Sequence, residues 1–233
     1  MEINLWRFIL TRLSNFVIKI CKITGFLCFS TPVFASNVCD KFYRKVDVSS
    51  VINYGNVIYK SVPKSEIVSF QKLNNPEKTL GVTVANIQIK YDFDFDRYKV
   101  RDGVCVNLSK MNFFVGYPVL NVLIDEKYEK GSCEYDAIKQ HEKEHIAIYQ
   151  RELKYYGNLL IEELRNAVSD ISPMFFLKNI SQAKVKAKID DIITKNPNIL
   201  LIKQKLEKSV VDGNRAFDSE EEYLSVNSKC KNW

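Results

Sequence analysis

Apolar residues recur at helical spacing in the middle of the chain. Steps of three and four residues place one set of side chains on a single stripe of a helix. This set is Ile138, His141, His145, Tyr149, Leu153, Tyr156, Leu160 and Leu164. Ser132 is a candidate N-cap, and Glu134 and Asp136 follow in the first turn, where the helix dipole favours acidic side chains. The pattern predicts a helix over about 132–168 that continues through Gly157.

Before this helix, apolar and polar residues alternate with the period of two that is typical of strands. The clearest alternating segment covers residues 80–95, and its parity changes near Ala85-Asn86, which predicts a bulge there. Further predicted strands are Val57–Tyr59, Ile67–Phe70, Val104–Leu108, Asn112–Val115 and Val119–Ile124, with turns at Asn74-Asn75-Pro76 and Arg101-Asp102-Gly103. We therefore expect residues 36–125 to be mainly β.

Helical patterns dominate the remainder of the chain. Two segments, about 179–194 and 198–211, are separated by Asn196-Pro197, so we expect 175–233 to be a helical C-terminal part. The predicted fold class is α+β, in which an antiparallel sheet packs against the long helix and C-terminal helices follow.

Residues 1–35 have the three parts of an export signal. A basic leader ends at Lys22, an apolar stretch covers 23–34, and Val33-Phe34-Ala35 offers small residues for signal peptidase. An uncleaved anchor from Leu5 to Phe34 is the alternative, but charged residues interrupt it, whereas a spanning helix needs about 20 largely apolar residues. We expect an exported protein, periplasmic or secreted, with no stable membrane insertion after signal cleavage.

The composition fits one globular domain over residues 36–233. Of the 233 residues, 46% are hydrophobic and 27% are charged, which is ordinary for a folded protein with a core. The formal net charge is +6, but half of this excess belongs to the predicted signal peptide. There is also no run of Lys or Arg with interleaved aromatic residues, so the sequence does not favour nucleic acid as a partner.

Four of the six cysteines follow the predicted signal peptide. Cys39, Cys105, Cys133 and Cys230 are an even number, which predicts two disulfides in an oxidising compartment. Three pairings are possible, and we favour Cys105–Cys133 with Cys39–Cys230, because these would tie a strand to the long helix and join the two ends of the domain. A thiolate zinc ligand is the alternative use, but none of the four has a C-x-x-C partner.

The segment from His141 to His145 reads H-E-x-x-H, and its two histidines are the only ones in the chain. Four residues apart on a helix, both imidazoles project from one face, so they can share a metal ion. Glu142 can then accept a proton from a metal-bound water. The same residues satisfy the reversed order H-x-x-E-H, in which Glu144 would be the base, but we favour Glu142. The alternative without a metal is that both histidines simply pack in the core.

Zinc is the expected metal, because two imidazoles, one further protein ligand and a water are its catalytic arrangement. Glu162 and Glu163 are candidates for the further ligand. On an unbroken helix they would lie about 25 Å along the axis from His145, so they can serve only if the helix turns back at Gly157.

Asp218 is another candidate for the third ligand. A disulfide at Cys230 could hold the acidic tail against the body of the domain and bring Asp218, or one of the glutamates Glu220, Glu221 and Glu222, to the metal. Alternatively, Asp218 or Ser219 caps a solvated acidic helix. The sequence leaves the third ligand open.

Part of the chain resembles a known family. Gly116-Tyr117-Pro118, the segment from Gly131 to Ile138, and the motif from His141 to His145 resemble uncharacterised secreted bacterial proteins that are regarded as zinc-dependent proteases of the HExxH, zincin-like type. The resemblance covers Leu80 to Tyr156, with a weaker similarity from Asp218 to Cys230. It implies an exported α+β domain with zinc on the two motif histidines and the motif glutamate as base, and it does not supply a third ligand.

These features together predict an exported zinc metallopeptidase that acts on a peptide or protein substrate. His141 and His145 are the expected metal ligands, and Glu142 is the expected catalytic base. A non-catalytic envelope protein with a structural or degenerate metal site is the main alternative, and a binding module without a metal is the third. The sequence does not indicate the oligomeric state.

Overall fold

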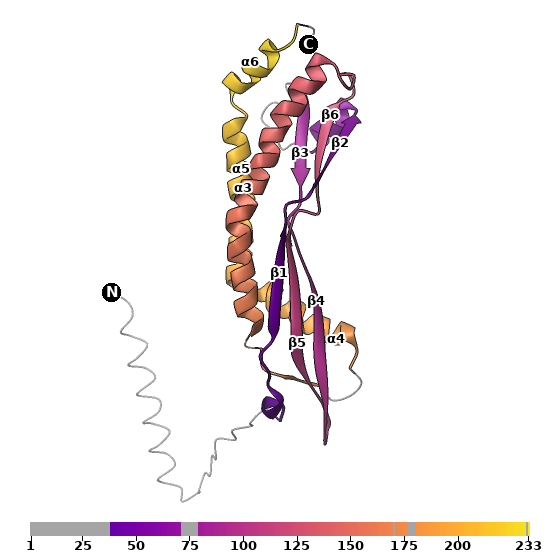
Figure 1. Cartoon of the computed structure of the whole chain (residues 1–233), viewed down its shortest axis with the longest axis vertical. Coiled ribbons are helices and arrows are strands. Elements are labelled where there is room, and N and C mark those ends of the chain that lie inside the picture. Colours follow the sequence, from indigo (N-terminus) through magenta and orange to yellow (C-terminus); the bar gives the residue numbers. More distant parts are fainter. Residues whose placement is uncertain (1–37, 71–78, 170, 177–179, 232) are drawn as a thin grey trace, which may run out of the picture. The chain divides into compact units, whose positions relative to one another are not determined.

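In the computed structural model, the strands and helices described below belong to one compact unit, Val38–Trp233 (Figure 1). The described residues are 38–70, 79–169, 171–176, 180–231 and 233. The predicted signal peptide and the predicted turn at Asn74-Asn75-Pro76 lie outside this described part.

The described strands form two mixed sheets. They are β1 (Asp47–Asn53), β2 (Asn56–Val62), β3 (Gly81–Ala85), β4 (Gln88–Val100), β5 (Gly103–Gly116), β6 (Val119–Asp125) and β7 (Met174–Phe176). The first sheet has the order β1-β5-β4, with β7 also paired to β5, and the second has the order β2-β6-β3. β1 is parallel to β5 and β2 is parallel to β6, whereas the other pairs are antiparallel.

The chain passes directly from a strand of one sheet to a strand of the other after β1, after β3 and after β5, and it returns to the first sheet at β7, after α3. β1 and β5 run in the same direction, and each continues into the second sheet. They are therefore parallel to each other, and the strands that follow them, β2 and β6, are parallel as well. The expected α+β class is confirmed, but the expectation of a purely antiparallel sheet is wrong for this reason.

The second passage also explains the change of parity near Ala85-Asn86. β3 ends at Ala85, and β4 begins in the other sheet, so the predicted bulge at this point is wrong. The register of the β4–β5 pair shifts later, between Asp94 and Phe95. The hairpin predicted at Arg101-Asp102-Gly103 is confirmed, because it joins β4 to β5.

The described helices are α2 (Lys64–Ser69), α3 (Cys133–Ser169), α4 (Gln182–Lys195), α5 (Pro197–Phe217) and α6 (Glu220–Ser228), with a short 3-10 helix η1 (Asp40–Phe42). α2 replaces the strand predicted at Ile67–Phe70. Pro63 precedes its first residue with a φ of −57°, and Ile67 is completely buried beside Leu123. A helix this short, with Ile67 as its single buried residue, does not produce a helical period in the sequence.

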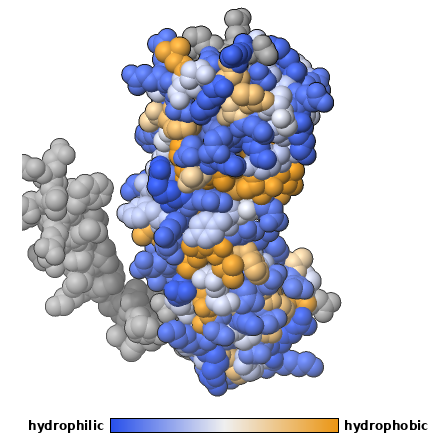
Figure 2. Space-filling view, turned by 45° about the horizontal axis from the view of Figure 1, so that its top comes forward, coloured by the Kyte–Doolittle hydropathy of each residue, from blue (hydrophilic) through white to orange (hydrophobic). Residues whose placement is uncertain are grey.

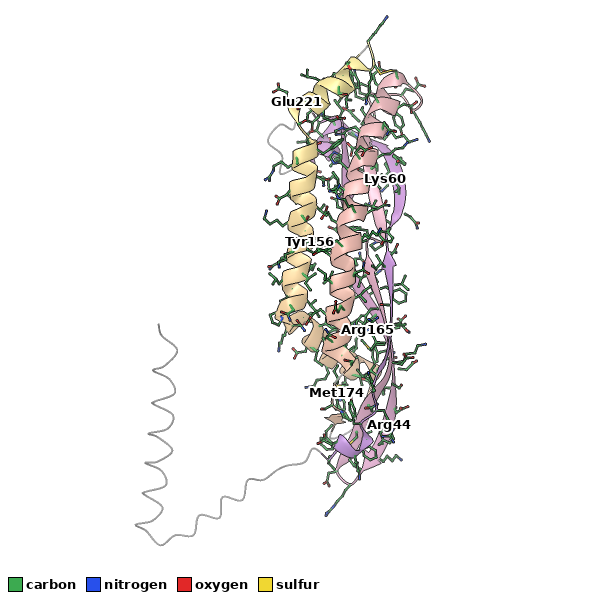
Figure 3. All side chains as sticks on the ribbon, turned by 60° about the vertical axis from the view of Figure 1, so that its left-hand side comes forward. Arg44, Lys60, Tyr156, Arg165, Met174 and Glu221 are labelled. Atoms are coloured by element: carbon green, nitrogen blue, oxygen red, sulfur yellow. A yellow bond between two sulfur atoms is a disulfide. The ribbon has the colours of Figure 1, made fainter. Side chains whose placement is uncertain are left out.

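α3 is continuous through Gly157, as the apolar stripe predicted. Ser132 caps its start, since its Oγ accepts a hydrogen bond of 3.1 Å from the backbone N–H of Tyr135. α3 packs against strands of both sheets, and α5 runs beside it in the opposite direction (Figures 1 and 3). Leu153 and Leu160 on the stripe are completely buried. The helix therefore links the two sheets and provides the platform on which α5 packs.

The described residues form two disulfides, as predicted, but the favoured pairing is wrong. Cys39 is bonded to Cys105, with their Cα atoms 5.4 Å apart, and Cys133 is bonded to Cys230, with a separation of 5.9 Å. The first joins the start of η1 to β5, and the second joins the start of α3 to the residue that closes the α6 region. Disulfides persist in oxidising compartments, which agrees with the expected export.

Hydrophilic residues cover most of the face seen in Figure 2, with hydrophobic patches between them. Exposed large hydrophobic side chains include Val51, Ile58, Leu201 and Leu224. Within the described ranges, no helix combines the length and the apolar character needed to cross a membrane.

Gly116 lies where the chain passes from β5 to the second sheet, and Gly131, which also has a positive φ, provides a matched control. Gly116, at φ +148°, ends β5, and a Cβ there would lie 2.0 Å from the carbonyl oxygen of Asn53. Gly131, at φ +92°, has no heavy atom within 4 Å of such a Cβ. We expect Gly116→Ala to lower the free energy of unfolding by about 3 kcal/mol or more and Gly131→Ala by about 1 kcal/mol. Urea denaturation measures both, and equal losses would contradict the prediction.

Candidate metal centre

The motif histidines meet a carboxylate from the C-terminal helices. His141 Nε2 and His145 Nε2 lie 3.2 Å apart. Asp218 Oδ1 is 3.2 Å from the first of these nitrogens and 3.0 Å from the second. Three donor atoms therefore form a nearly equilateral triangle, although Asp218 is 77 residues from His141 in sequence.

This triangle has the dimensions of one face of a metal coordination shell. Bonds of about 2.0–2.2 Å from one ion to imidazole and carboxylate ligands place neighbouring donor atoms about 3.0–3.5 Å apart. The observed separations of 3.0–3.2 Å fall in this range. The donor atoms of His141, Glu142 and His145 also lie within 4.8 Å of one another. The residues of this site can therefore hold a metal ion.

Glu142 is held next to the triangle by strand β3. Its Oε2 accepts a hydrogen bond of 2.8 Å from the Thr83 hydroxyl. β3 approaches α3 closely at this point, since a Cβ added to Gly81 would lie 2.8 Å from Glu142 Oε1 and 2.8 Å from the Ile138 side chain. Only 2% of Glu142 is exposed. The strand thus fixes the orientation of the carboxylate.

The outer nitrogens of the two imidazoles face residues of α5 and α6. His145 Nδ1 lies 3.0 Å from Asn214 Oδ1, so the amide oxygen can accept the Nδ1 proton. This hydrogen bond leaves the Nε2 lone pair directed at the triangle, as in many metal sites. His141 Nδ1 is buried and lies 3.5 Å from Glu222 Oε1, in an orientation that makes no hydrogen bond. The C-terminal segment therefore supplies a ligand candidate and the surroundings of both rings.

Phe217 covers one side of the histidine pair. Its ring stacks on His141 with a centroid distance of 4.9 Å and meets the edge of His145 at 5.2 Å. His141 and His145 are 8% and 7% exposed. The side chains of Asp218 and Glu222 remain 24% and 28% exposed, so the site is more open on the side of the C-terminal segment.

The local sequence explains why Asp218 is free to face the histidines. α5 ends at Phe217, and the Asp218 N–H still donates to the carbonyl of Asn214. The next helix starts at once, because Ser219 Oγ accepts a hydrogen bond of 3.2 Å from the Glu222 N–H. Ser219 is therefore the cap that the sequence allowed for, which leaves the Asp218 side chain available. The Cys133–Cys230 disulfide holds this segment close to the start of α3.

The ionisable groups of the site shift one another's pKa values. Burial alone would lower the pKa of His145, but hydrogen bonding to Asp218 and the charges of Glu142 and Asp218 raise this pKa to about 9. Burial alone would raise the pKa of Asp218, whereas its hydrogen bonds to the two imidazoles lower it to about 2. Burial raises the pKa of Glu142. The His145 imidazole and the Asp218 carboxylate therefore each stabilise the charged form of the other.

The other candidate carboxylates lie away from this site. Glu144 is exposed on α3, so it does not share the buried position of Glu142. Glu163 Oε1 accepts hydrogen bonds from the side chains of Asn196 and Asn198, at 3.2 and 3.1 Å, where α4 meets α5. Glu162 is exposed on the same unbroken helix. Neither glutamate of this pair is a third ligand, because α3 does not turn back at Gly157.

Several residues of the site were not predicted. Thr83, Asn214 and Phe217 contact the motif residues, whereas Glu222, which approaches His141, is one of the tail glutamates already considered as a ligand. Asn214, Asp218 and Glu222 recur at steps of four, which is a spacing that could have suggested a common face. Thr83 has no comparable pattern, since its contact with Glu142 exists only because β3 packs on α3.

Comparisons of the chain with protein-family models, curated proteins and solved structures found no significant match.

Asp218→Ala tests the third ligand. We expect the affinity for zinc to fall by more than the roughly 10- to 100-fold that loss of an outer hydrogen-bond partner costs, because a direct ligand disappears. Glu163→Ala is the matched control, since its carboxylate lies at the α4–α5 junction. Competition with a chromogenic chelator measures both affinities, and equal affinities for the two variants would rule out Asp218 as a ligand.

Zinc binding should release a proton. Because the pKa of His145 is raised to about 9, zinc must displace a proton at neutral pH. The apparent affinity should therefore rise about tenfold per pH unit between pH 6 and 8 and level off above about pH 9. Calorimetric titrations in buffers of different ionisation enthalpy count the protons released, and a binding constant that does not change with pH would contradict this assignment.

Proposed function

We propose that the chain is a zinc-dependent hydrolase that cleaves peptide bonds in a peptide or protein substrate outside the cytoplasm. The observation that carries this proposal is the triangle of His141, His145 and Asp218 donor atoms, 3.0–3.2 Å apart, with the Glu142 carboxylate beside it. Two imidazoles and one carboxylate are a ligand set of catalytic zinc sites.

The donor set supports zinc over harder metals. Imidazole nitrogen suits zinc and its neighbours in the first transition series, whereas magnesium and calcium prefer sites built from oxygen alone. Bound at these ligands, zinc would polarise a substrate carbonyl and lower the pKa of a water molecule.

Glu142 has the properties of a general base. Burial raises its pKa, so its carboxylate accepts a proton more readily than an exposed glutamate does. We infer that it takes one proton from the water whose oxygen adds to the carbonyl carbon, and then gives that proton to the amine nitrogen as the C–N bond breaks. The Thr83 hydroxyl, which donates to Oε2, keeps the carboxylate in place during both transfers.

The resemblance of the region around the motif supports the zinc site more than it supports the peptidase activity. The glycine-containing segment from Gly131 to Ile138 and the motif from His141 to His145 resemble secreted bacterial proteins that are regarded as zinc-dependent proteases. The two disulfides agree with a working place outside the cytoplasm.

The burial of the site favours a second candidate function, a non-catalytic envelope protein with a structural metal. Phe217 covers both imidazoles, and Glu142 is 2% exposed. A structural zinc site is closed by four protein ligands, whereas a catalytic site keeps a position for water. A crystal structure of the zinc-loaded protein distinguishes the two, because it shows whether a fourth protein side chain or a water molecule completes the coordination shell.

Glu142→Gln tests the proposed catalytic role. We expect kcat/KM for peptide cleavage to fall at least about 100-fold, because the amide cannot accept the proton, while the zinc content stays unchanged. Glu144→Gln is the matched control, since this exposed glutamate lies on the same turn of α3 and should leave cleavage intact. Cleavage of fluorogenic peptides and metal analysis are the two measurements. Full activity of Glu142→Gln would remove this residue from the mechanism.

A further inference from the structure

A hollow of about 260 Å³ lies beside the metal-site residues. It is lined by Leu80, Tyr128, Glu220, Tyr223, Leu224, Asn227 and Trp233. The four lining residues from α6 recur at positions i, i+3, i+4 and i+7, so they form one face of that helix. Its volume is below the roughly 300–1,000 Å³ of typical small-molecule sites, and it suits a single long side chain.

Two of its walls also border the metal-site residues. The Tyr223 ring lies 5.9 Å from the His141 ring, centroid to centroid. Leu80 directly precedes Gly81, whose backbone lies against Glu142. The hollow therefore lies near His141 and Glu142. A polypeptide held at the metal site would place one of its side chains next to this hollow.

The charge of the lining has one sign. Among the described residues that line the hollow, Glu220 is the only charged one, and it forms no salt bridge with another described residue. The remaining walls are aliphatic or aromatic, apart from Asn227. The faces of Tyr and Trp rings attract cations, and the Lys127 ammonium already lies 5.1 Å from the centre of the Tyr128 ring. The lining thus combines an apolar channel with an unpaired negative charge.

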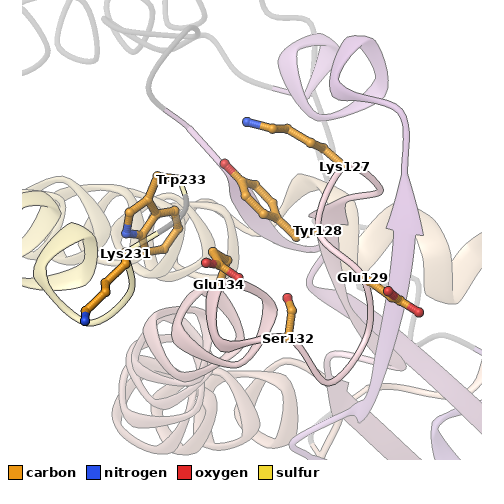
Figure 4. Close-up of a pocket in the computed structure, with 7 residues that line it drawn as sticks. All are labelled: Lys127, Tyr128, Glu129, Ser132, Glu134, Lys231 and Trp233. Carbon is orange, nitrogen blue, oxygen red and sulfur yellow. The ribbon is translucent and has the colours of Figure 1, made fainter.

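A neighbouring hollow is lined by side chains of both charges. It shares Tyr128 and Trp233 with the first but also contains Lys127 and Lys231 as well as Glu129 and Glu134 (Figure 4). Both signs of charge occur there, so it favours no particular charge on a ligand.

We infer that the hollow beside Glu220 binds a lysine or arginine side chain of the polypeptide substrate. The methylene groups of such a side chain would pack on Leu80 and Leu224, and its cationic head would lie near Glu220 and the aromatic rings. This inference rests on the proposed function, and it adds to that function a substrate class, polypeptides with a basic residue near the bond that is cleaved.

Trp233 allows this inference to be tested without catalysis. The chain has two tryptophans, Trp6 and Trp233, and Trp6 lies in the predicted signal peptide. In a full-length chain that carries Trp6→Phe and Glu142→Gln, Trp233 is the sole tryptophan whether or not the signal is cleaved. Its fluorescence then reports occupation of the hollow during titration with blocked peptides of the form Ala-Ala-X-Ala-Ala in the presence of zinc. We expect arginine or lysine at X to lower Kd about fivefold relative to norleucine, and glutamate to raise it.

A charge reversal provides the decisive control. Glu220→Lys should invert the preference, so that glutamate at X binds more tightly than arginine. Glu221→Lys is the matched variant, because Glu221 is equally exposed in the first turn of α6 and does not line the hollow. Equal binding of the arginine and norleucine peptides, the same behaviour of both lysine variants, or no fluorescence change with any peptide would overturn the inference. If the binding preference holds but the chain with native Glu142 cleaves no peptide, the proposed hydrolase function fails while this binding site stands.

Discussion

A buried cluster of donor atoms needs a positive charge at its centre, and this requirement organises the candidate site. His141 Nε2, His145 Nε2 and Asp218 Oδ1 face one another at 3.0–3.2 Å, and the Glu142 carboxylate is close by. Lone pairs and negative charge at such short range repel one another in a buried environment unless a proton or a metal ion lies between them. The raised pKa of His145 shows that a proton is held there more tightly than on a free imidazole. The distances between the donor atoms suit a metal ion.

Three separate parts of the fold bring these atoms together. α3 presents both imidazoles, β3 holds Glu142 through Thr83, and the junction of α5 and α6 supplies Asp218. α5 ends at Phe217 and Ser219 caps α6, so the chain changes direction where the carboxylate is needed. The Cys133–Cys230 disulfide links the start of α3 to the segment after α6, and so holds the C-terminal segment near the helix that carries the histidines.

The passage of the chain between two sheets gives α3 its supporting surface. β1, β3 and β5 each continue into a strand of the other sheet, and α3 packs along both (Figure 1). β3 therefore reaches the part of α3 that carries Glu142, while the remaining length of the helix packs in the apolar core with Leu153 and Leu160. Gly81 permits the close approach, since any larger residue would displace the glutamate.

Features that depend on residues close in sequence could be predicted from the sequence alone. The helical period placed His141, His145 and the apolar residues of α3 on one buried face, and the Ser132 cap defined the start of that helix. The even number of cysteines after the predicted signal peptide indicated two disulfides. All of these follow from local geometry, because side chains three or four residues apart share a helix face whatever the rest of the chain does.

The tertiary structure alone decided which distant groups meet. It selected Asp218 over Glu162 and Glu163, paired Cys133 with Cys230, and divided the strands between two sheets. Each of these contacts joins segments that are far apart in the chain, and no period in the sequence records such a contact. The free energy that selects them comes from packing the whole core, in which α5 lies along α3 and carries the third donor to the histidines.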